Sequence, residues 1–447
     1  MQKKEYTLDL EGKIITASFT DLVDQANGSV MLSCENTVVL ATAVMSKSGK
    51  HNPGYFDLQV SYEERFYAGG EILGARYTRR EGRPSTRAVL SSRIIDRTLR
   101  PLFAHHIRNA VQIVITVLSV GTYDPTLLGI NAASLAIATS NIPWAGPVAG
   151  VQLLAVSGEE YHINTTRDKG TVYETDLVVC GRGGTINMIE AATYEVSEDH
   201  AIKALQTAEP LILQLEEWQK GIVAEIGKEK ITIETPTCPQ DVLDLFDKTM
   251  RPKMLVELFG EDSKTRIDTL EGEWDGIVDE MYPGDDEDTH NTRRLGAYHF
   301  HTMVDEILHE AALTENKRAD LRAMDEVRDL YAQVGGISPL LHGTGIFYRG
   351  GTHMLTVLTL AGPDKKLLEE GMEVQEEKDF FHHYNFPPYS AGETGRIGGA
   401  NRRAIGHGML AEKALAPVLP NKTDFPYTMR LVSESMASNG STSQAAI

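Results

Sequence analysis

Apolar and polar residues alternate over the first sixty residues, and this pattern predicts β-strands. Residues 14–19 and 37–44 are rich in strand-forming side chains and are bounded by Gly, Asn and Ser. Residues 85–103 carry apolar side chains at helical spacing, interleaved with arginines. Residues 111–118 predict a central strand, and the alanine-rich residues 127–137 predict a buried helix that ends before Pro143. Strands followed by helices indicate an α+β domain.

The middle of the chain, from about residue 201 to 316, has a helical and acidic pattern. One apolar helix face is expected there, made of Phe300, Met303, Val304, Ile307, Leu308 and Ala311. The strand pattern resumes from Asp320. We therefore predict a first α+β domain over residues 1–222, a helical domain over 223–317, and a second α+β domain over 318–447 that is incomplete at its C-terminus.

Part of the chain is repeated. Gly28-Ser29-Val30-Met31-Leu32, followed by Thr37 and Leu40, returns as Gly343-Thr344-Gly345-Ile346-Phe347, followed by Thr352 and Leu355, at a constant offset of 315 residues. Further on, Ala391-Gly392 and Arg402-Arg403 are matched to Ala68-Gly69 and Arg79-Arg80, at an offset of 323. The repeat predicts one duplicated domain, in which one copy can keep chemistry while the other keeps binding.

Composition places the chain among ordinary globular proteins. Of its 447 residues 41% are apolar and 24% are charged, and no stretch approaches the roughly 20 apolar residues of a membrane helix. Cys34, Cys180 and Cys238 lack metal-ligand spacing and are expected to be reduced and mostly buried. The net charge of −20 argues against nonspecific nucleic-acid binding by the whole surface. The segment from Arg65 to Arg108, however, contains many arginines and no lysine, which is typical of a focused polyanion site.

Arginines are concentrated in the loop of residues 77–85 and in the helix that is expected after it. The candidate RNA- or phosphate-binding side chains are Arg79, Arg80, Arg83, Arg93, Arg97 and Arg100. The last three share a helix face that could follow the phosphates of one strand, with nearby tyrosines available to stack on bases. A salt-bridge network with Asp96 and Glu81 is the alternative, and the two interpretations are compatible.

Two further motifs lie in the second copy. Residues 395–408 combine glycines with Arg402, Arg403 and His407, which suits anion binding or proton transfer, although a histidine in such a loop is often structural. Ser441, Thr442 and Ser443 precede an expected helix, where hydroxyl and N–H groups bind anions or simply cap the helix. The first copy has Asp124-Pro125-Thr126 in the approximate counterpart region, so we expect the phosphate site in the second copy.

These motifs resemble those of the bacterial polynucleotide phosphorylase family. The matching stretches are Arg79-Arg80-Glu81-Gly82-Arg83-Pro84-Ser85, Ile95 to Phe103, Phe381-His382-His383-Tyr384-Asn385-Phe386-Pro387-Pro388-Tyr389-Ser390, Gly392-Glu393-Thr394-Gly395, Arg402-Arg403, Ile405-Gly406-His407-Gly408, Phe425-Pro426-Tyr427-Thr428 and Ser438-Asn439-Gly440-Ser441. The resemblance covers nearly the whole chain and is weakest in the helical part. It implies two ribonuclease-PH-like domains (ribosomal protein S5 domain 2-like) that flank an all-helical domain.

The resemblance also implies phosphorolytic 3′→5′ RNA degradation, in which inorganic phosphate releases nucleoside 5′-diphosphates from single-stranded RNA during mRNA breakdown. Arg402, Arg403 and His407 would line the active site, and Ser441, Thr442 and Ser443 would hold the attacking phosphate. Arg79, Arg80 and Arg83 would line the RNA channel of a homotrimer. The family implies Mg²⁺ or Mn²⁺, a cytoplasmic location without membrane attachment, and possible membership of an RNA-degradation complex.

Several features depart from the family pattern. The catalytic aspartates and metal ligands of the family are expected beyond Ile447, as are its KH and S1 domains, so this chain alone is expected to be inactive. Pro339-Leu340-Leu341-His342-Gly343 lacks the arginine of the family's Pro-Arg-Thr-His-Gly. Three hypotheses stay open: a segment of an active enzyme, a short inactive RNA-binding or scaffold protein on the same fold, and a related ring nuclease that uses acids such as Glu393, Glu412 or Asp424.

Overall fold

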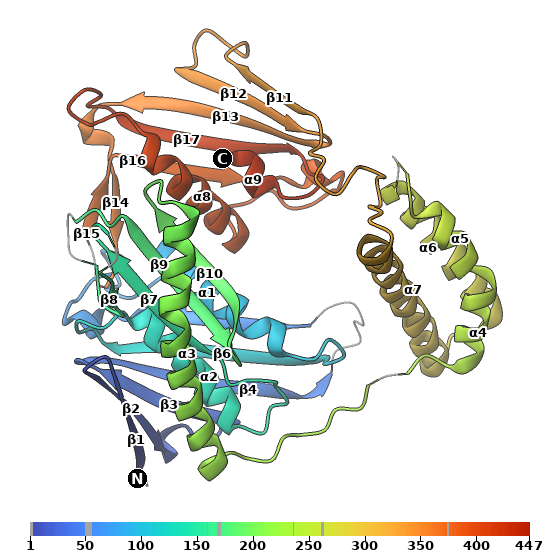
Figure 1. Cartoon of the computed structure of the whole chain (residues 1–447), viewed down its shortest axis with the longest axis horizontal. Helices are drawn as coiled ribbons and strands as arrows, with labels where there is room; N and C mark the ends of the chain where they lie inside the picture. Colours follow the sequence, from blue (N-terminus) through green and yellow to red (C-terminus); the bar gives the residue numbers. More distant parts are fainter. Residues whose placement is uncertain are drawn as a thin grey trace.

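The computed structural model describes residues 3–49, 56–158, 160–167, 171–235, 237–260, 263–372 and 375–447. Two units of sheet and helix lie against each other, and a group of helices lies to one side (Figure 1). The chain runs from the first copy of the repeat into the helices and returns to form the second copy (Figure 1). This is the α+β, helical, α+β order that the hydrophobic pattern predicts.

The first copy begins with a six-stranded sheet in the order β1-β2-β3-β4-β6-β5. Its strands are β1 (Lys3–Leu10), β2 (Lys13–Thr20), β3 (Gly28–Cys34), β4 (Thr37–Gly49), β5 (Leu58–Glu63) and β6 (Asn109–Ser119). Neighbours are antiparallel except for β5 and β6, which are parallel. β6 lies between β4 and β5 with Val111, Ile113 and Ile115 fully buried, so the predicted interior strand is confirmed.

Helices and a second sheet complete the first copy. They are α1 (Thr86–Leu99), α2 (Pro125–Thr139), α3 (Glu198–Ile226) and the sheet β10-β9-β7-β8, made of β7 (Ala149–Ala155), β8 (His162–Ile163), β9 (Thr175–Arg182) and β10 (Thr185–Thr193). Every residue of α2 is buried, because the helix packs on strands β3 and β4 of one sheet and on β7 of the other. A helix that is covered on all sides is apolar all round, which explains the alanine-rich sequence.

The helical region contains α4 (Gln240–Thr249), α5 (Arg251–Glu257), α6 (Ser263–Met281) and α7 (Glu287–Thr314). Phe246, Trp274 and Phe300 form the centre of its separate core. The predicted apolar face of α7 is confirmed, since Phe300, Met303, Val304, Ile307 and Ala311 are buried and Leu308 packs beside them. The boundary predicted after residue 222 falls within α3, which packs on the first copy.

The second copy repeats the first sheet with the order β11-β12-β13-β17-β16. Its elements are β11 (Leu330–Val334), β12 (Gly343–Arg349), β13 (Thr352–Ala361), β16 (Phe380–Asn385), β17 (Thr428–Ala437), α8 (Arg402–Leu415) and α9 (Thr442–Ala446), with a hairpin of β14 (Leu367–Glu370) and β15 (Gln375–Lys378). β12 and β13 begin 315 residues after β3 and β4, and the registers of the two hairpins match. The duplication is therefore confirmed.

The offset of 323 predicted for the later part of the repeat is wrong. α1 and α8 have equal lengths and begin at Thr86 and Arg402, so Arg402-Arg403 corresponds to Thr86-Arg87 and not to Arg79-Arg80. Gly70 and Gly392, both left-handed, end matching turns at a shift of 322. The second copy has the additional β14–β15 hairpin and a shorter loop before α8. These two changes in length nearly cancel, so a sequence comparison without gaps cannot detect them.

Candidate active site

Arg402 and Arg403 occupy the first turn of α8. The helix begins there because the Asn401 side chain accepts a hydrogen bond from the Ala404 N–H at 2.9 Å. Two cations at this end oppose the helix dipole, so helix stability does not explain them. The Arg402 Nη2 donates to Ser92 Oγ of α1 at 2.8 Å, and the Arg403 guanidinium lies 4.0 Å from the centre of the Phe386 ring. Arg402 is thereby held at the junction of the two copies, and Arg403 is held against a ring of its own copy.

Two glycines let α8 approach its neighbours closely. A Cβ atom at Gly406 would lie 2.3 Å from the Nε of Arg93, and one at Gly408 would lie 2.6 Å from the carbonyl oxygen of His382. The contact with the His382 backbone excludes a side chain at Gly408, and a side chain at Gly406 would displace the Arg93 guanidinium from its place. The glycines therefore allow the Arg93 side chain of the first copy to lie directly against α8.

A basic cavity of about 440 Å³ separates α1 from α8. Its charged lining residues are Arg93, Asp96, Arg97, Arg100, Glu190, Arg402 and Lys413. Arg93 is half-buried and makes no hydrogen bond or ion pair with any residue that the structure describes. Burial, followed by repulsion from Arg402 and Arg97, lowers the pKa of Arg93. The cavity thus holds cationic groups without enough neighbouring acids, which is the electrostatic condition for binding an anion.

The other arginines of the predicted α1 stripe have protein partners. Arg97 bonds Glu190 at 2.5 Å, and Lys413 of α8 reaches the same carboxylate at 2.8 Å. Arg100 pairs with Asp96 at 2.7 Å and also donates to the carbonyl groups of Phe56 and Leu58. The stripe therefore combines Arg93, which faces the cavity without a partner among the described residues, with two arginines that also tie structural elements together.

His407 lies inside the second copy, against Tyr384. Their ring centres are 4.9 Å apart, and the Tyr384 hydroxyl donates to Thr442 Oγ1 at 2.6 Å. Burial, and then the positive charges of Arg403 and Arg93, lower the pKa of His407 to about 4. His407 is therefore neutral at pH 7 and can offer hydrogen bonds but no charge. Tyr384, which sequence reasoning did not single out, connects it to the serine-rich turn.

The Ser441–Ser443 turn lies at the start of α9. Ser441 is exposed and has left-handed backbone angles, with φ of 44°, whereas Thr442 is only 1% exposed and its hydroxyl is engaged by Tyr384. Ser441 and the partly exposed Ser443 are thus the hydroxyl groups of this run with access to a ligand. The structure brings the turn to α8 through the chain of contacts Thr442, Tyr384 and His407.

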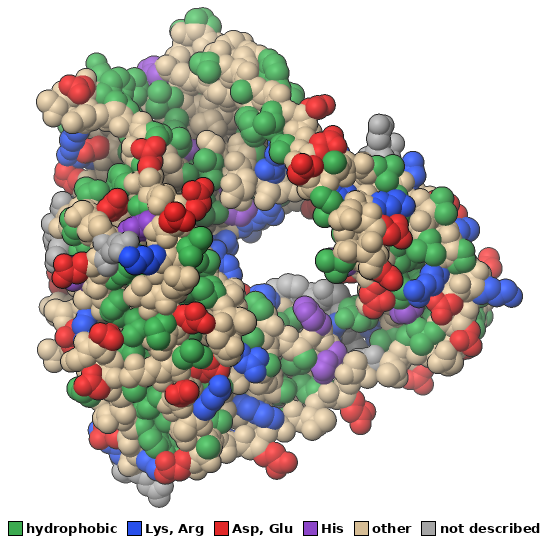
Figure 2. All heavy atoms as spheres, in the orientation of Figure 1, with side chains coloured by type: hydrophobic (Ala, Val, Ile, Leu, Met, Phe, Trp, Pro, Cys, Tyr) green, Lys and Arg blue, Asp and Glu red, His purple; other side chains and the backbone are tan. Residues whose placement is uncertain are grey.

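Arg79, Arg80 and Arg83 are exposed in the loop before α1. Glu81 fixes this loop by accepting from the Phe66 N–H at 3.1 Å. A Cβ at Gly399 of the second copy would lie 3.9 Å from Arg83 Nη1, so the loops that precede α1 and α8 meet. Basic side chains follow part of the rim of the opening between the two copies and the helical region (Figure 2). These arginines are placed at the approach to the cavity and not among its lining residues.

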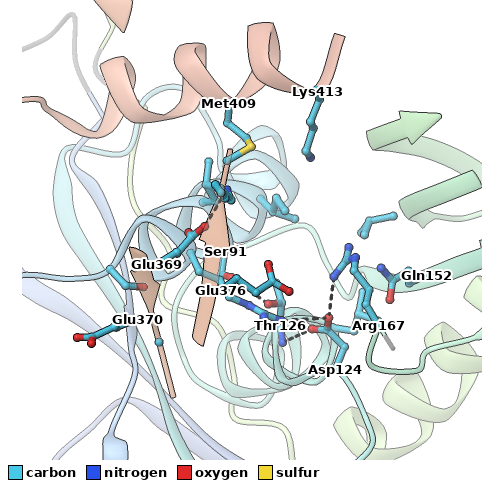
Figure 3. A pocket seen from close by; sticks show the side chains of 18 residues that line it. Ser91, Asp124, Thr126, Gln152, Arg167, Glu369, Glu370, Glu376, Met409 and Lys413 are labelled. Atoms are coloured by element: carbon cyan, nitrogen blue, oxygen red, sulfur yellow. Dashed lines mark hydrogen bonds and ion pairs between the residues drawn. The ribbon is translucent and has the colours of Figure 1, made fainter. Parts of the chain in front are cut away.

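The first copy carries a counterpart of this site with different side chains. Arg87, Ser91, Asp124 and Thr126 line a cavity of about 290 Å³ at the positions of Arg403, His407, Ser441 and Ser443 (Figure 3). The Asp124 carboxylate accepts from the Thr126 N–H at 2.8 Å and lies 3.6 Å from Arg167 and 3.8 Å from Arg87. A buried protein carboxylate therefore stands at the position that the second copy leaves to Ser441.

Neither disulfides nor membrane helices are found in the described parts of the chain. The three cysteines are free, with Cys34 and Cys180 buried as predicted. Within the described ranges no helix has the length and apolar character needed to cross a bilayer. The same ranges hold no group of three or more His, Cys, Asp or Glu side chains arranged to hold a metal ion.

Contacts across the junction were not evident from the sequence. Ser92, Glu190 and Lys413 belong to the cavity or support it, but each meets partners that lie about one hundred to three hundred residues away in the chain. Such contacts leave no local motif. The conspicuous signal was the arginine and glycine pattern on the two helices.

Comparison with known proteins matches both copies to one family. The model of the 3′ exoribonuclease family, domain 1, matches residues 11–143 and 326–447, which correspond to the two copies. The chain is 40% identical over 451 residues to the polyribonucleotide nucleotidyltransferase of Halalkalibacterium halodurans and 39% identical over 447 residues to that of Bacillus subtilis. Each alignment covers 100% of this chain but only 62% or 63% of the relative, so the chain spans less than two thirds of their length.

A solved structure, that of rice (Oryza sativa) Rrp46, covers 50% of this chain and 94% of its own, with a TM-score of 0.37 and 14% sequence identity. The family match does not depend on this similarity. Because the family model accounts for more than half of the chain, once in each copy, the chain belongs to the 3′ exoribonuclease family.

Proposed function

We propose that the protein is a phosphorolytic 3′→5′ exoribonuclease of the polyribonucleotide nucleotidyltransferase type. It would use inorganic phosphate to remove nucleoside 5′-diphosphates from the 3′ end of single-stranded RNA. The observation that carries the proposal is a basic cavity between α1 and α8 that Arg93 and Arg402 line, on a helix that the Ser441–Ser443 turn reaches through Tyr384 and His407. Phosphorolysis brings two phosphate groups together, and cations are needed to offset their repulsion.

The chemistry assigns roles to these groups. An oxygen of inorganic phosphate attacks the phosphorus of the terminal phosphodiester, the bond from phosphorus to the 3′ oxygen breaks, and the shortened RNA leaves with a 3′-hydroxyl. Ser441 and Ser443 would donate hydrogen bonds to the attacking phosphate. Arg402 and Arg403 would bind both phosphate groups, and Arg93 would bind the RNA backbone from the first copy. Neutral His407 would orient the turn through Tyr384.

The proposed reaction includes a divalent cation, Mg²⁺ or Mn²⁺, but the residues named above would not hold it. The described chain offers no fitting cluster of acidic or histidine ligands, so none of the steps above is assigned to a metal.

The approach of RNA is the second part of the proposal. Arg79, Arg80 and Arg83 are exposed where the loops of the two copies meet, and would guide a single strand towards the cavity in a homotrimeric ring. We also propose a cytoplasmic location, a role in mRNA degradation and membership of an RNA-degradation complex, which the resemblance of the sequence motifs implies.

The test is an assay of the protein expressed from its complete reading frame. Single-stranded RNA labelled at its 5′ end should shorten only when inorganic phosphate is present, with release of nucleoside diphosphates. Arg79→Ala with Arg80→Ala should weaken binding of long RNA and reduce the slope of log affinity against log salt by about 1.4, with less effect on short oligonucleotides. Arg251→Ala with Lys253→Ala, in the helical region, is the matched control.

The outcomes separate the hypotheses. Nucleoside monophosphates released without phosphate would indicate a hydrolytic nuclease and contradict the proposal. RNA binding with no cleavage would favour the inactive RNA-binding protein. An unchanged salt slope in the Arg79/Arg80 variant would remove these residues from the RNA path.

A further inference from the structure

Two arginines hold the serine-rich turn of the second copy from behind. The Arg349 Nη2, at the end of β12, donates to the carbonyl oxygens of Gly440 at 2.9 Å and Ser441 at 3.0 Å. The Arg328 Nη1, just before β11, donates to the carbonyl oxygen of Asn439 at 2.5 Å. Three successive carbonyl groups are thus directed towards guanidinium groups on the neighbouring strands.

A threonine contact is common to both copies, whereas the contact of Arg349 is not. Thr352 donates to Gly440 O at 3.0 Å, just as Thr37 of the first copy donates to Tyr123 O at 2.7 Å. The residue that matches Arg349 in the first copy is Cys34, which is buried and carries no charge. The threonine contact therefore belongs to the repeated fold, while Arg349 is found only in the copy whose turn carries Ser441.

Because the peptide bond is planar, the contacts of Arg349 with carbonyl groups also fix the direction of the N–H groups that follow them. In a trans peptide the C=O and the following N–H point in opposite directions. When Arg349 fixes the carbonyl groups of Gly440 and Ser441, it also directs the N–H groups of Ser441 and Thr442 away from itself. Gly440 and Ser441 both have positive φ, 85° and 44°, and a serine in this conformation needs such external support.

We propose that Arg349, supported by Arg328, is a positioning residue for the phosphate-binding turn. It acts through the carbonyl groups of residues 439–441, and so holds the N–H groups of Ser441 and Thr442 and the Ser441 hydroxyl ready for inorganic phosphate. The inference rests on the proposed function, because that function makes this turn the phosphate site. It predicts that loss of Arg349 raises the KM for inorganic phosphate and leaves the KM for RNA nearly unchanged.

The experiment compares Arg349→Met and Arg349→Lys with the wild-type protein from the complete reading frame. Arg349→Met removes both carbonyl contacts and should raise the KM for inorganic phosphate about tenfold, with the KM for RNA changed less than about twofold. Arg349→Lys keeps one cationic donor and should recover most of the affinity for phosphate. Amide hydrogen exchange of residues 440–443 should be faster in Arg349→Met, and saturating phosphate should reverse the change.

Lys13→Met is the matched control. Lys13 stands 315 residues before Arg328 and likewise donates to two backbone carbonyl groups, those of Ile163 and Asn164, in the first copy. Its loss should leave the KM for phosphate unchanged. Equal rises of both KM values in Arg349→Met, or an unchanged KM for phosphate, would overturn the inference. A wild-type protein that does not consume phosphate would instead contradict the proposed function, which the assay of the wild type reveals first.

Discussion

The two copies of the repeated domain place different chemistry on one framework. Their sheets share strand order and register, and α1 and α8 start with matching geometry. At the site itself, Asp124 stands in the first copy where Ser441 stands in the second, and Ser91 where His407 stands. The same framework therefore carries different side chains at corresponding positions of the two copies.

A buried carboxylate is one of these differences. In the first copy Asp124 is buried beside Arg87 and Arg167, so the protein supplies the anion itself (Figure 3). In the second copy Ser441 has no charge, and Arg402 and Arg403 are close to one another with no carboxylate bound to either among the described residues. A duplicated site can thus carry a buried carboxylate of the protein in one copy and a hydroxyl group in the other.

The largest expected effect comes from removing the cations of the second copy. Arg402→Ala with Arg403→Ala should lower phosphorolysis by about 10³-fold, because charge that develops between two phosphates loses its stabilisation. Product release measured against phosphate concentration checks this, and light scattering should show unchanged assembly. Arg87→Ala, at the position of Arg403 in the first copy, is the control and should change the rate less than about threefold. Turnover near wild type in the double variant would contradict the site.

The next largest effect should come from exchanging the residue that differs at the turn of each copy, which is Ser441 in the second copy and Asp124 in the first. Ser441→Asp places a carboxylate in the turn, where aspartate tolerates the left-handed backbone, and should weaken phosphate use by about 10²-fold through repulsion. Asp124→Ser should leave activity intact but lower the free energy of unfolding of the first copy by about 1–2 kcal/mol, because two arginines lose their buried partner. Phosphate titrations and urea unfolding measure the two effects. An active Ser441→Asp protein would show that the turn does not meet phosphate.

The fold was largely predictable because local patterns determine it. The alternation in residues 14–19 and 37–44, the alanine-rich α2 and the apolar face of α7 each reflect burial within one element. The repeat was detected through strands that kept their length. Its later part was misaligned because the second copy inserts a hairpin and shortens a loop, and two opposite changes in length cannot be located without coordinates.

The site was predictable only at the level of residue type. The Arg402-Arg403 pair and the glycines at 406 and 408 could be identified, because few structural roles need that combination. The side chains that complete the arrangement, Ser92 on α1 and Arg349 behind the turn, contact partners about 90 to 310 residues away. Only the packing of α1 on α8 and of β12 beside the turn shows what they touch.

The smallest expected effect is a difference between the copies in sensitivity to acid. His382 is 3% exposed in β16, and burial, followed by the charge of His383, lowers its pKa to about 4; the matching residue in the first copy is Val60. An unfolded histidine has a pKa near 6.5, so the native state binds fewer protons. Its contribution is complete above pH 6.5 and is lost as the pH falls to about 4, amounting to roughly 3 kcal/mol.

Hydrogen exchange between pH 7 and 5, corrected for intrinsic rates, should therefore show the opening free energy of β16 and β17 falling while that of β5 and β6 stays nearly constant. His382→Gln, which removes the titrating group, should make the response of β16 and β17 shallower, although its loss of the contact with Ser433 lowers protection at every pH. His290→Gln, on the helical region, should leave the profile unchanged. An equal response of both sheets to acid would mean that carboxylates, and not the buried histidines of the second copy, control its stability in this range.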